Sequence, residues 1–451
     1  MDLKPSIELK IHTVFATKKV PSWPKPDLDL DEEMSRIMTL LGNVGRRFHH
    51  ENQCTVEFVK GQLIRDFSGL DEMKNRAEDC DAILFFNLTS GVGKFIDPVV
   101  DIADQLDIPF LFFSQPFSGH DWIKYTQLKR FDLKVDLIAS SDFNELLPDL
   151  RALKAIKEIR ASKILVISDF DESSIENKNK NQGNSHRKKL GVEIEYMDSE
   201  DLVRFFEEID EKEAITLADQ WIDRAEYVIE PDKSEIIKST KLYLAMLKLM
   251  EERKGNAITI NCLGLFRMEK LPAYPCLAFT ILNDQGLLGV CEADVNSTIT
   301  QLIGQSMGMR PGFVTDPLFD TAKNELIHAH CVSATRMASF TGPRNDYRIR
   351  SHMEDNKGVS LQVFMNEGEK ISMFKYVDYN DQMLASEGEI TRNIDFDRGC
   401  RTKFGTKVKN LRKWMETYRD SLHRVVFYGD LLREFELFCR FMDIEFVRED
   451  L

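Results

Sequence analysis

The chain has 451 residues, of which 43% are hydrophobic and 30% charged, which is too long for one hydrophobic core at roughly 100 to 200 residues per domain. Its formal net charge of -15 disfavours nucleic acid and anionic membranes as partners. The most hydrophobic runs are only as long as a β-strand, which is too short for a membrane-spanning helix. The eight cysteines form no C-x-x-C pair. We therefore expect reduced thiols and a cytoplasmic location, with neither a disulfide scaffold nor a zinc ribbon.

The amino-terminal third alternates apolar, β-rich runs with amphipathic stretches, which is typical of βαβ units in a parallel sheet. Helical spacing is expected at residues 31–48 and 143–160, and Pro98 lies near the start of another helix. The predicted strands are residues 7–16, 55–59, 82–88, 108–115, 135–140 and 163–168.

A very polar stretch at residues 169–191 predicts a solvated loop or helix face, after which a second α/β unit begins. Its expected helices lie at 202–206, 212–225 and 233–253, and its expected strands at 192–197 and 257–266. After Thr335 the pattern changes to period-two strands joined by polar turns, which indicates antiparallel structure. These antiparallel strands are expected at 358–365, 369–377 and 387–395, followed by a helix near 408–418, a strand at 423–430 and a last helix at 431–442.

The patterns predict an α/β protein with two doubly wound domains followed by a β-rich, antiparallel, barrel-like domain. The expected boundaries are residues 1–160, 161–335 and 336–451.

Acidic residues and histidines gather in the segment 276–334, at the ends of expected strands, where α/β proteins build sites. Glu292 and Asp294 follow the strand LLGVC, Asp316 ends the strand GFVT, and His330 ends the strand ELIHAH. Carboxylates with an imidazole suit a hard divalent ion such as Mg²⁺ or Mn²⁺. The plainer alternative is that Asp294 caps the following helix.

Two further histidines also have alternative interpretations. His328, two residues before His330, is equally compatible with a core or surface position. His423 stands at the amino end of an expected strand, and a surface histidine that closes the preceding helix is the simpler interpretation.

Read in order, the motifs of the second half resemble the fucose isomerase and arabinose isomerase superfamily, and most of all its fucose isomerase-like branch. They are CEADV at Cys291, FVTDP at Phe313, HAHC at His328, RSH at Arg350, GVSLQV at Gly358, GCRT at Gly399 and LHRVVFYGD at Leu422. The likeness covers the chain from about Ala257 to its end.

The resemblance implies a cytoplasmic aldose–ketose isomerase, an intramolecular oxidoreductase that binds Mn²⁺, or Mg²⁺, and a deoxy- or modified monosaccharide. It also implies a homo-oligomer, a trimer or hexamer, whose neighbouring subunit completes the site; residues near Trp122 are expected at that contact. By the same resemblance Glu292, Asp316 and His423 hold the ion.

The implied chemistry is transfer of a hydrogen between C1 and C2 through an enediol, with Glu292 and Asp316 as the catalytic proton-shuttling groups. His330 and Arg350 are expected to orient substrate hydroxyls. Arabinose-type enzymes have a glutamate where Thr315 stands here, so the second acid has either moved one place to Asp316, as in the fucose type, or been lost, which argues against an arabinose-type enzyme. The alternative is a non-catalytic sugar-binding or regulatory protein on the same scaffold.

Overall fold

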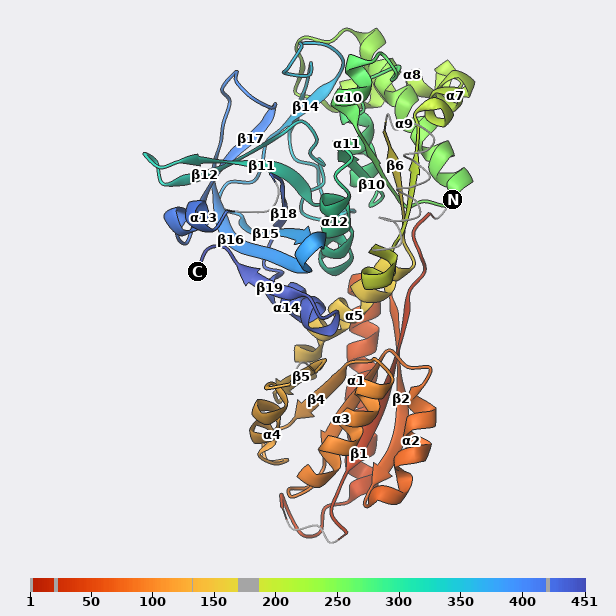
Figure 1. Ribbon diagram of the computed structural model, residues 1–451, viewed down its shortest axis with the longest axis vertical. Coiled ribbons are helices and arrows are strands. Elements are labelled where there is room, and N and C mark those ends of the chain that lie inside the picture. Colours follow the sequence, from red (N-terminus) through yellow and green to blue (C-terminus); the bar gives the residue numbers. More distant parts are fainter. Residues whose placement is uncertain (1–2, 20–22, 132, 169–185, 419–421) are drawn as a thin grey trace. The chain divides into compact units, whose positions relative to one another are not determined.

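The computed structural model of the protein describes residues 3–19, 23–131, 133–168, 186–418 and 422–451 (Figure 1). The chain divides into two compact units. The amino-terminal unit comprises Ser6–Lys157 and Arg433–Glu445, and the large unit comprises Met1–Pro5, Glu158–Leu432 and Phe446–Leu451.

The amino-terminal unit is built on a parallel sheet in the order β2-β1-β3-β4-β5, an order that occurs in doubly wound α/β domains. All six residues of β3 are buried, as expected for a parallel strand covered on both faces. Figure 1 shows the helices of this unit packed along the sheet. The elements are β1 (Glu8–Ala16), α1 (Leu30–Asn52), β2 (Thr55–Ile64), α2 (Leu70–Ala77), β3 (Ala82–Asn87), α3 (Ile96–Gln105), β4 (Phe110–Ser114), α4 (Asp121–Leu128), β5 (Val135–Ala139) and α5 (Leu147–Arg160).

The last helix of the chain, α14 (Leu432–Phe441), belongs mostly to this same unit. Its Arg433 and Arg440 lie 2.5 and 2.6 Å from the carboxylate of Asp136 on β5, which is 1% exposed. A buried carboxylate needs such partners, because leaving it unpaired costs several kcal/mol. The ion pairs therefore fix α14 against the sheet.

The large unit begins with a second parallel sheet in the order β10-β9-β6-β7. The expected strand at 257–266 is too long, because Asn261 accepts a hydrogen bond from the Gly264 amide and starts a helix there. The elements of this part are β6 (Lys163–Ile167), β7 (Glu193–Met197), α7 (Glu200–Glu208), α8 (Glu211–Arg224), α9 (Lys233–Arg253), β9 (Ala257–Ile260), α10 (Cys262–Arg267), α11 (Cys276–Asp284), β10 (Leu288–Cys291) and α12 (Val295–Gly308).

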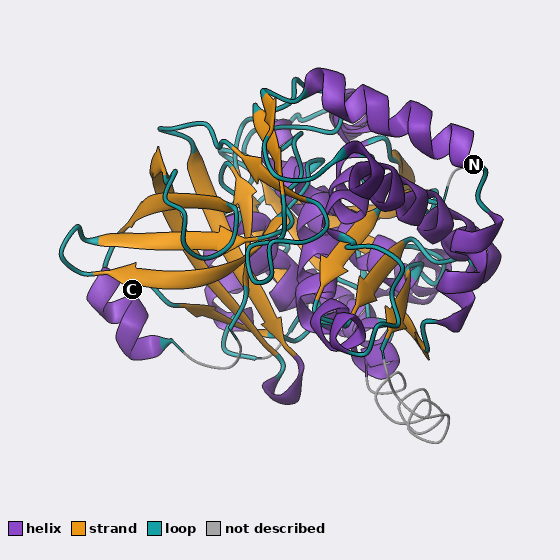
Figure 2. Cartoon of the chain, turned by 90° about the horizontal axis from the view of Figure 1, so that it is seen from above, coloured by secondary structure: helices purple, strands orange, loops and turns teal. Residues whose placement is uncertain are grey.

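Six of the described strands then close into an antiparallel barrel in the order β15-β18-β11-β12-β17-β16 and back to β15. Figure 2 shows that few helices lie beside the long strands near the carboxyl terminus. The barrel elements are β11 (Phe313–Asp320), β12 (Glu325–His330), β15 (Lys370–Val377), β16 (Gln382–Asn393), β17 (Thr402–Val408) and β18 (Arg424–Tyr428), with α13 (Leu411–Thr417) between β17 and β18 and β19 (Glu445–Arg448) at the edge of β16.

The antiparallel strands thus start at Phe313, earlier than the change of pattern after Thr335 indicates. The stretch 358–365 contributes β14 (Ser360–Val363), which pairs outside the barrel with β13 (Tyr347–Arg350) and, through it, with β8 (Tyr227–Val228). The polar stretch at 169–191 lies mostly outside the described residues. Within the described parts of the chain, every helix is too short or too polar to cross a membrane.

Candidate metal centre

A strained turn between β10 and α12 presents Glu292. Glu292 and Ala293 both adopt the left-handed backbone conformation, with φ of 67° and 51°. The amide of Ala293 donates to the carbonyl of Ile260 on the neighbouring strand at 3.0 Å, which anchors the turn. Such a conformation costs about 1–3 kcal/mol per non-glycine residue and is typical of functional sites. The turn leaves the Glu292 side chain 36% exposed.

Asp294 caps α12, as its place before the helix predicted. Its Oδ1 accepts from the Ser297 amide at 2.9 Å, and its Oδ2 lies 2.7 Å from both Lys375 Nζ and His423 Nδ1. Burial opposes the charge of Asp294, but Lys375 and His423 hold its pKa far below the ordinary value. Asp294 therefore stays ionised and orients His423.

His423 lies between three carboxylates. Its Nε2 is 3.2 Å from Asp316 Oδ1 and 3.5 Å from Glu292 Oε2, on the opposite side of the ring from Asp294. Burial works against protonation, but hydrogen bonding to Asp294 and Asp316 and the charge of Glu292 raise its pKa to about 9. A cation that binds Nε2 therefore displaces a proton from the ring. The structure thus favours a site histidine over the surface histidine that was the simpler interpretation of the sequence.

His330 joins the same cluster from the end of β12, where the sequence predicted it. Its Nε2 lies 3.7 Å from Glu292 Oε1, and its ring centre is 5.3 Å from that of His423. Burial lowers the pKa of His330 to about 4, so the ring is neutral and its nitrogen is free to bind a cation. Ligand atoms of Glu292, His330 and His423 all lie within 4.8 Å of one another.

Asp316 lies within β11, and the prediction that it ends the strand is wrong, because β11 continues to Asp320 to pair with β12. Its carboxylate faces His423, whereas the neighbouring Thr315 is fully buried and hydrogen-bonds to His328. The structure thus places Asp316, and not Thr315, at the cluster. Burial opposes the charge of Asp316, but His423 and His330 lower its pKa.

The cluster fits a hard divalent cation. The donor atoms already converge, since His423 Nε2 lies 3.2 Å from Asp316 Oδ1 and 3.5 Å from Glu292 Oε2. Carboxylate oxygens with one or two imidazole nitrogens suit Mn²⁺ or Mg²⁺.

Two other candidates lie away from this cluster. Arg350, expected to contact substrate, has its Nε 2.8 Å from Glu230 and its Nη1 3.1 Å from Gln362. His328 is fully buried against the Phe404 ring, and burial lowers its pKa to about 3, which favours the core interpretation.

Lys375 is the site residue that the sequence analysis did not identify. It is 0% exposed and contacts Asp294 and Ser297 from β15. The sequence feature that could have identified Lys375 is its position inside the mostly apolar strand KISMFKYV, because a buried lysine requires a buried counter-charge.

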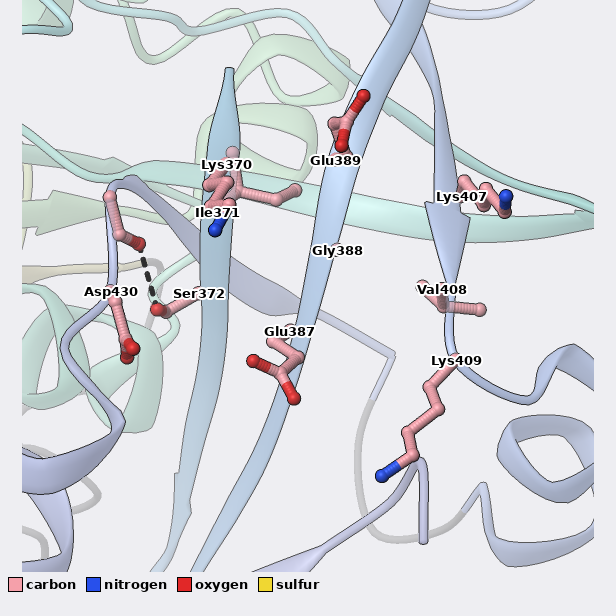
Figure 3. A pocket seen from close by; sticks show the side chains of 11 residues that line it. Lys370, Ile371, Ser372, Glu387, Gly388, Glu389, Lys407, Val408, Lys409 and Asp430 are labelled. Atoms are coloured by element: carbon pink, nitrogen blue, oxygen red, sulfur yellow. Dashed lines mark hydrogen bonds between the residues drawn. The ribbon is translucent and has the colours of Figure 1, made fainter. Parts of the chain in front are cut away.

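A separate pocket of about 460 Å³ lies beyond the carboxyl end of β18, whereas His423 precedes its amino end. Figure 3 shows its lining, in which lysines and carboxylates from three barrel strands surround the opening. Opposite charges are mixed there, and the pocket lacks histidine and cysteine, so the metal-site chemistry belongs to the Glu292 cluster.

Comparisons with known proteins identify no family. No family model matches the chain, and no curated protein matches it. Among solved structures, the chain is weakly similar to a periplasmic sugar-binding protein of an ABC sugar transporter from Legionella pneumophila (12% identity, 65% of this chain, 94% of that chain, TM-score 0.16). A similar match is GanP, a glucose-galactose binding protein from Geobacillus stearothermophilus (12% identity, 68% of this chain, 90% of that chain, TM-score 0.16). A galactofuranose binding protein matches at 11% identity over 66% of this chain and 98% of that chain, with a TM-score of 0.15. At these TM-scores the likeness carries no argument about fold or function.

Proposed function

We propose that the protein is a metal-dependent aldose–ketose isomerase of the fucose isomerase-like type, acting through an enediol on a deoxy- or modified monosaccharide. The observation that carries the proposal is the convergence of Glu292, Asp316, His423 and His330 from four separate elements of the chain. This set joins two carboxylates capable of proton transfer to a donor set for Mn²⁺ or Mg²⁺.

We assign each residue of the cluster a role from its exposure and its neighbours. Glu292 is the most exposed carboxylate of the cluster, at 36%, so it is assigned the proton transfer between C1 and C2. Asp316, 26% exposed and beside His423, is the second ligand and proton-shuttling group. His330, 1% exposed, is assigned the orientation of a substrate hydroxyl.

Asp294 and Lys375 fix the orientation of His423, because Asp294 contacts both Lys375 Nζ and His423 Nδ1. Asp294 contacts only one nitrogen of His423, which leaves Nε2 directed at Glu292 and Asp316. A partner that fixes the ring of a ligand histidine in this way typically changes metal affinity 10–100-fold when it is removed. When bound, Mn²⁺ or Mg²⁺ supplies Lewis-acid polarisation of the sugar carbonyl, worth several kcal/mol.

The test is metal-dependent deuterium exchange from D₂O into the C1 or C2 position of aldoses and ketoses, including deoxy and sulfonated hexoses, followed by NMR. We expect exchange that a chelator abolishes and that Glu292→Gln abolishes in a folded protein. Glu354→Gln is the matched control, because Glu354 is an exposed carboxylate close enough to influence Glu292 but outside the cluster. Full exchange by Glu292→Gln contradicts the proposal, and metal binding without exchange on any sugar favours the non-catalytic alternative.

We also propose the other features expected from the sequence, namely three domains with boundaries at 160 and 335, a cytoplasmic location and a homo-oligomer. Trp122, expected near a subunit contact, lies on α4 and is 57% exposed. Sedimentation of the active enzyme tests the oligomer, and a fully active monomer contradicts it.

A further inference from the structure

A second group of metal-binding side chains lies in the large unit, apart from the Glu292 cluster. Cys276 is the first residue of α11, Cys331 directly follows β12, and His352 follows β13. The ligand atoms of these three residues all lie within 4.8 Å of one another. They are widely separated in sequence, which is why the cysteine spacing gave no indication of a site.

The distances agree with tetrahedral coordination. Metal–sulfur and metal–nitrogen bonds of about 2.3 and 2.0 Å place two sulfurs about 3.8 Å apart and a sulfur and a nitrogen about 3.5 Å apart around Zn²⁺. Here Cys331 Sγ lies 3.4 Å from His352 Nε2, and Cys400 Sγ lies 3.9 Å from Cys331 Sγ. The sulfurs of Cys276 and Cys331 lie within 4.8 Å of each other. The side chains therefore need little movement to bind an ion.

His352 is oriented as a ligand histidine is. Its Nε2 faces Cys331, while its Nδ1 lies 3.8 Å from a carboxylate oxygen of Asp355. A carboxylate opposite the coordinating nitrogen is the usual outer partner of a zinc-bound histidine. Asp355 is placed for that role but lies beyond hydrogen-bond distance and accepts from the Tyr274 hydroxyl. His352 is 5% exposed and lies against the Tyr274 ring, with ring centres 5.4 Å apart.

We propose that Cys276, Cys331 and His352 bind one Zn²⁺ ion per chain, with Cys400 or a water molecule in the fourth position. Two thiolates and an imidazole are soft to borderline ligands, which select Zn²⁺ over Mn²⁺ or Mg²⁺. Binding releases two thiol protons to solvent, or three when Cys400 is the fourth ligand, and involves no electron transfer.

The site goes beyond the proposed sugar chemistry and does not depend on it. The ion joins α11 to the ends of β12 and β13, and Cys331 is the residue next to His330. Zinc therefore cross-links the segments that carry one side of the Glu292 cluster. Its expected effect is a higher melting temperature and a fixed position for His330.

Cobalt titration of the full-length, chelator-treated protein tests the site, because Co²⁺ bound by thiolate shows a charge-transfer absorption in the near ultraviolet. We expect this band to saturate at about one equivalent and to disappear when Zn²⁺ is added. Cys331→Ser, folded by circular dichroism, is expected to lose the band, and Asp355→Asn to weaken Zn²⁺ binding about 10-fold.

Two controls separate this site from other thiols and from the Glu292 cluster. Cys80→Ser removes a buried cysteine in the amino-terminal unit, and Glu292→Gln removes a carboxylate of the other cluster; both are expected to keep the band. Absence of the band in the wild-type protein, or its survival in Cys331→Ser, overturns the proposal. Loss of sugar exchange in Glu292→Gln with the band intact tests the proposed function separately.

Discussion

Replacement of Asp294 by Asn tests how the buried network holds His423. Asparagine caps a helix as well as aspartate does, so the start of α12 is retained. The NH₂ group that replaces Oδ2, however, cannot accept from Lys375 Nζ and His423 Nδ1, which both lie 2.7 Å from Oδ2, so donors face donors. The change also removes the counter-charge of Lys375, which is 0% exposed.

The expected loss of stability is about 3–5 kcal/mol, the cost of leaving one member of a buried ion pair without its partner. Mn²⁺ affinity is expected to fall about 10–100-fold, because the ring of His423 is no longer fixed. Urea unfolding followed by circular dichroism measures the first effect, and isothermal titration with Mn²⁺ the second.

The double variant Asp294→Asn/Lys375→Met separates the two effects, because it removes both charges of the pair. Stability is expected to recover to within about 1–2 kcal/mol of wild type, since a buried pair is often replaced by apolar groups at little cost. The Mn²⁺ affinity is expected to stay low. A single variant with wild-type stability and affinity refutes this account of the network.

Three further changes test packing and backbone strain by urea unfolding. Arg424→Met is expected to cost about 3–5 kcal/mol, because Arg424 and Glu449 form a pair that is 0% and 2% exposed; a loss below about 1 kcal/mol argues against it. Ala293→Gly is expected to stabilise by about 0.5–1 kcal/mol, since glycine relieves the left-handed conformation, and destabilisation contradicts that strain. Gly304→Ala is expected to cost about 1–3 kcal/mol, because its Cβ meets the Phe427 ring, whereas a neutral effect means that the ring moves freely.

Much of the fold follows from local patterns in the sequence. The helix over 233–253 has the bounds of α9, and the strands of the first sheet are placed within a few residues, apart from β2, which continues to Ile64. The helix at 262–267 was missed because its apolar residues continue the strand pattern of 257–260, and only the Asn261 cap marks the change. Strand pairing is non-local, so no local pattern indicated that β14 lies outside the barrel.

The sequence predicted the site residues that follow strands. It did not predict side-chain contacts that depend on which strands pack together. Glu292 and His330 follow strands β10 and β12, so their approach was expected. The contact of Asp294 with Lys375 joins residues 81 positions apart, and Arg350 pairs with Glu230, 120 positions away. Such partners depend on which strands neighbour one another, which the sequence alone does not state.

The measurement that tests the central claim most directly is an electron paramagnetic resonance titration of Mn²⁺ with wild-type protein, Asp316→Asn and Asp320→Asn. Asp320 is a matched control, because it is an aspartate at the far end of the same strand, β11, and contacts Lys323. We predict one tight Mn²⁺ site per chain in the wild type and in Asp320→Asn, and loss of that site in Asp316→Asn. Mn²⁺ binding by Asp316→Asn equal to that of the wild type contradicts the metal centre.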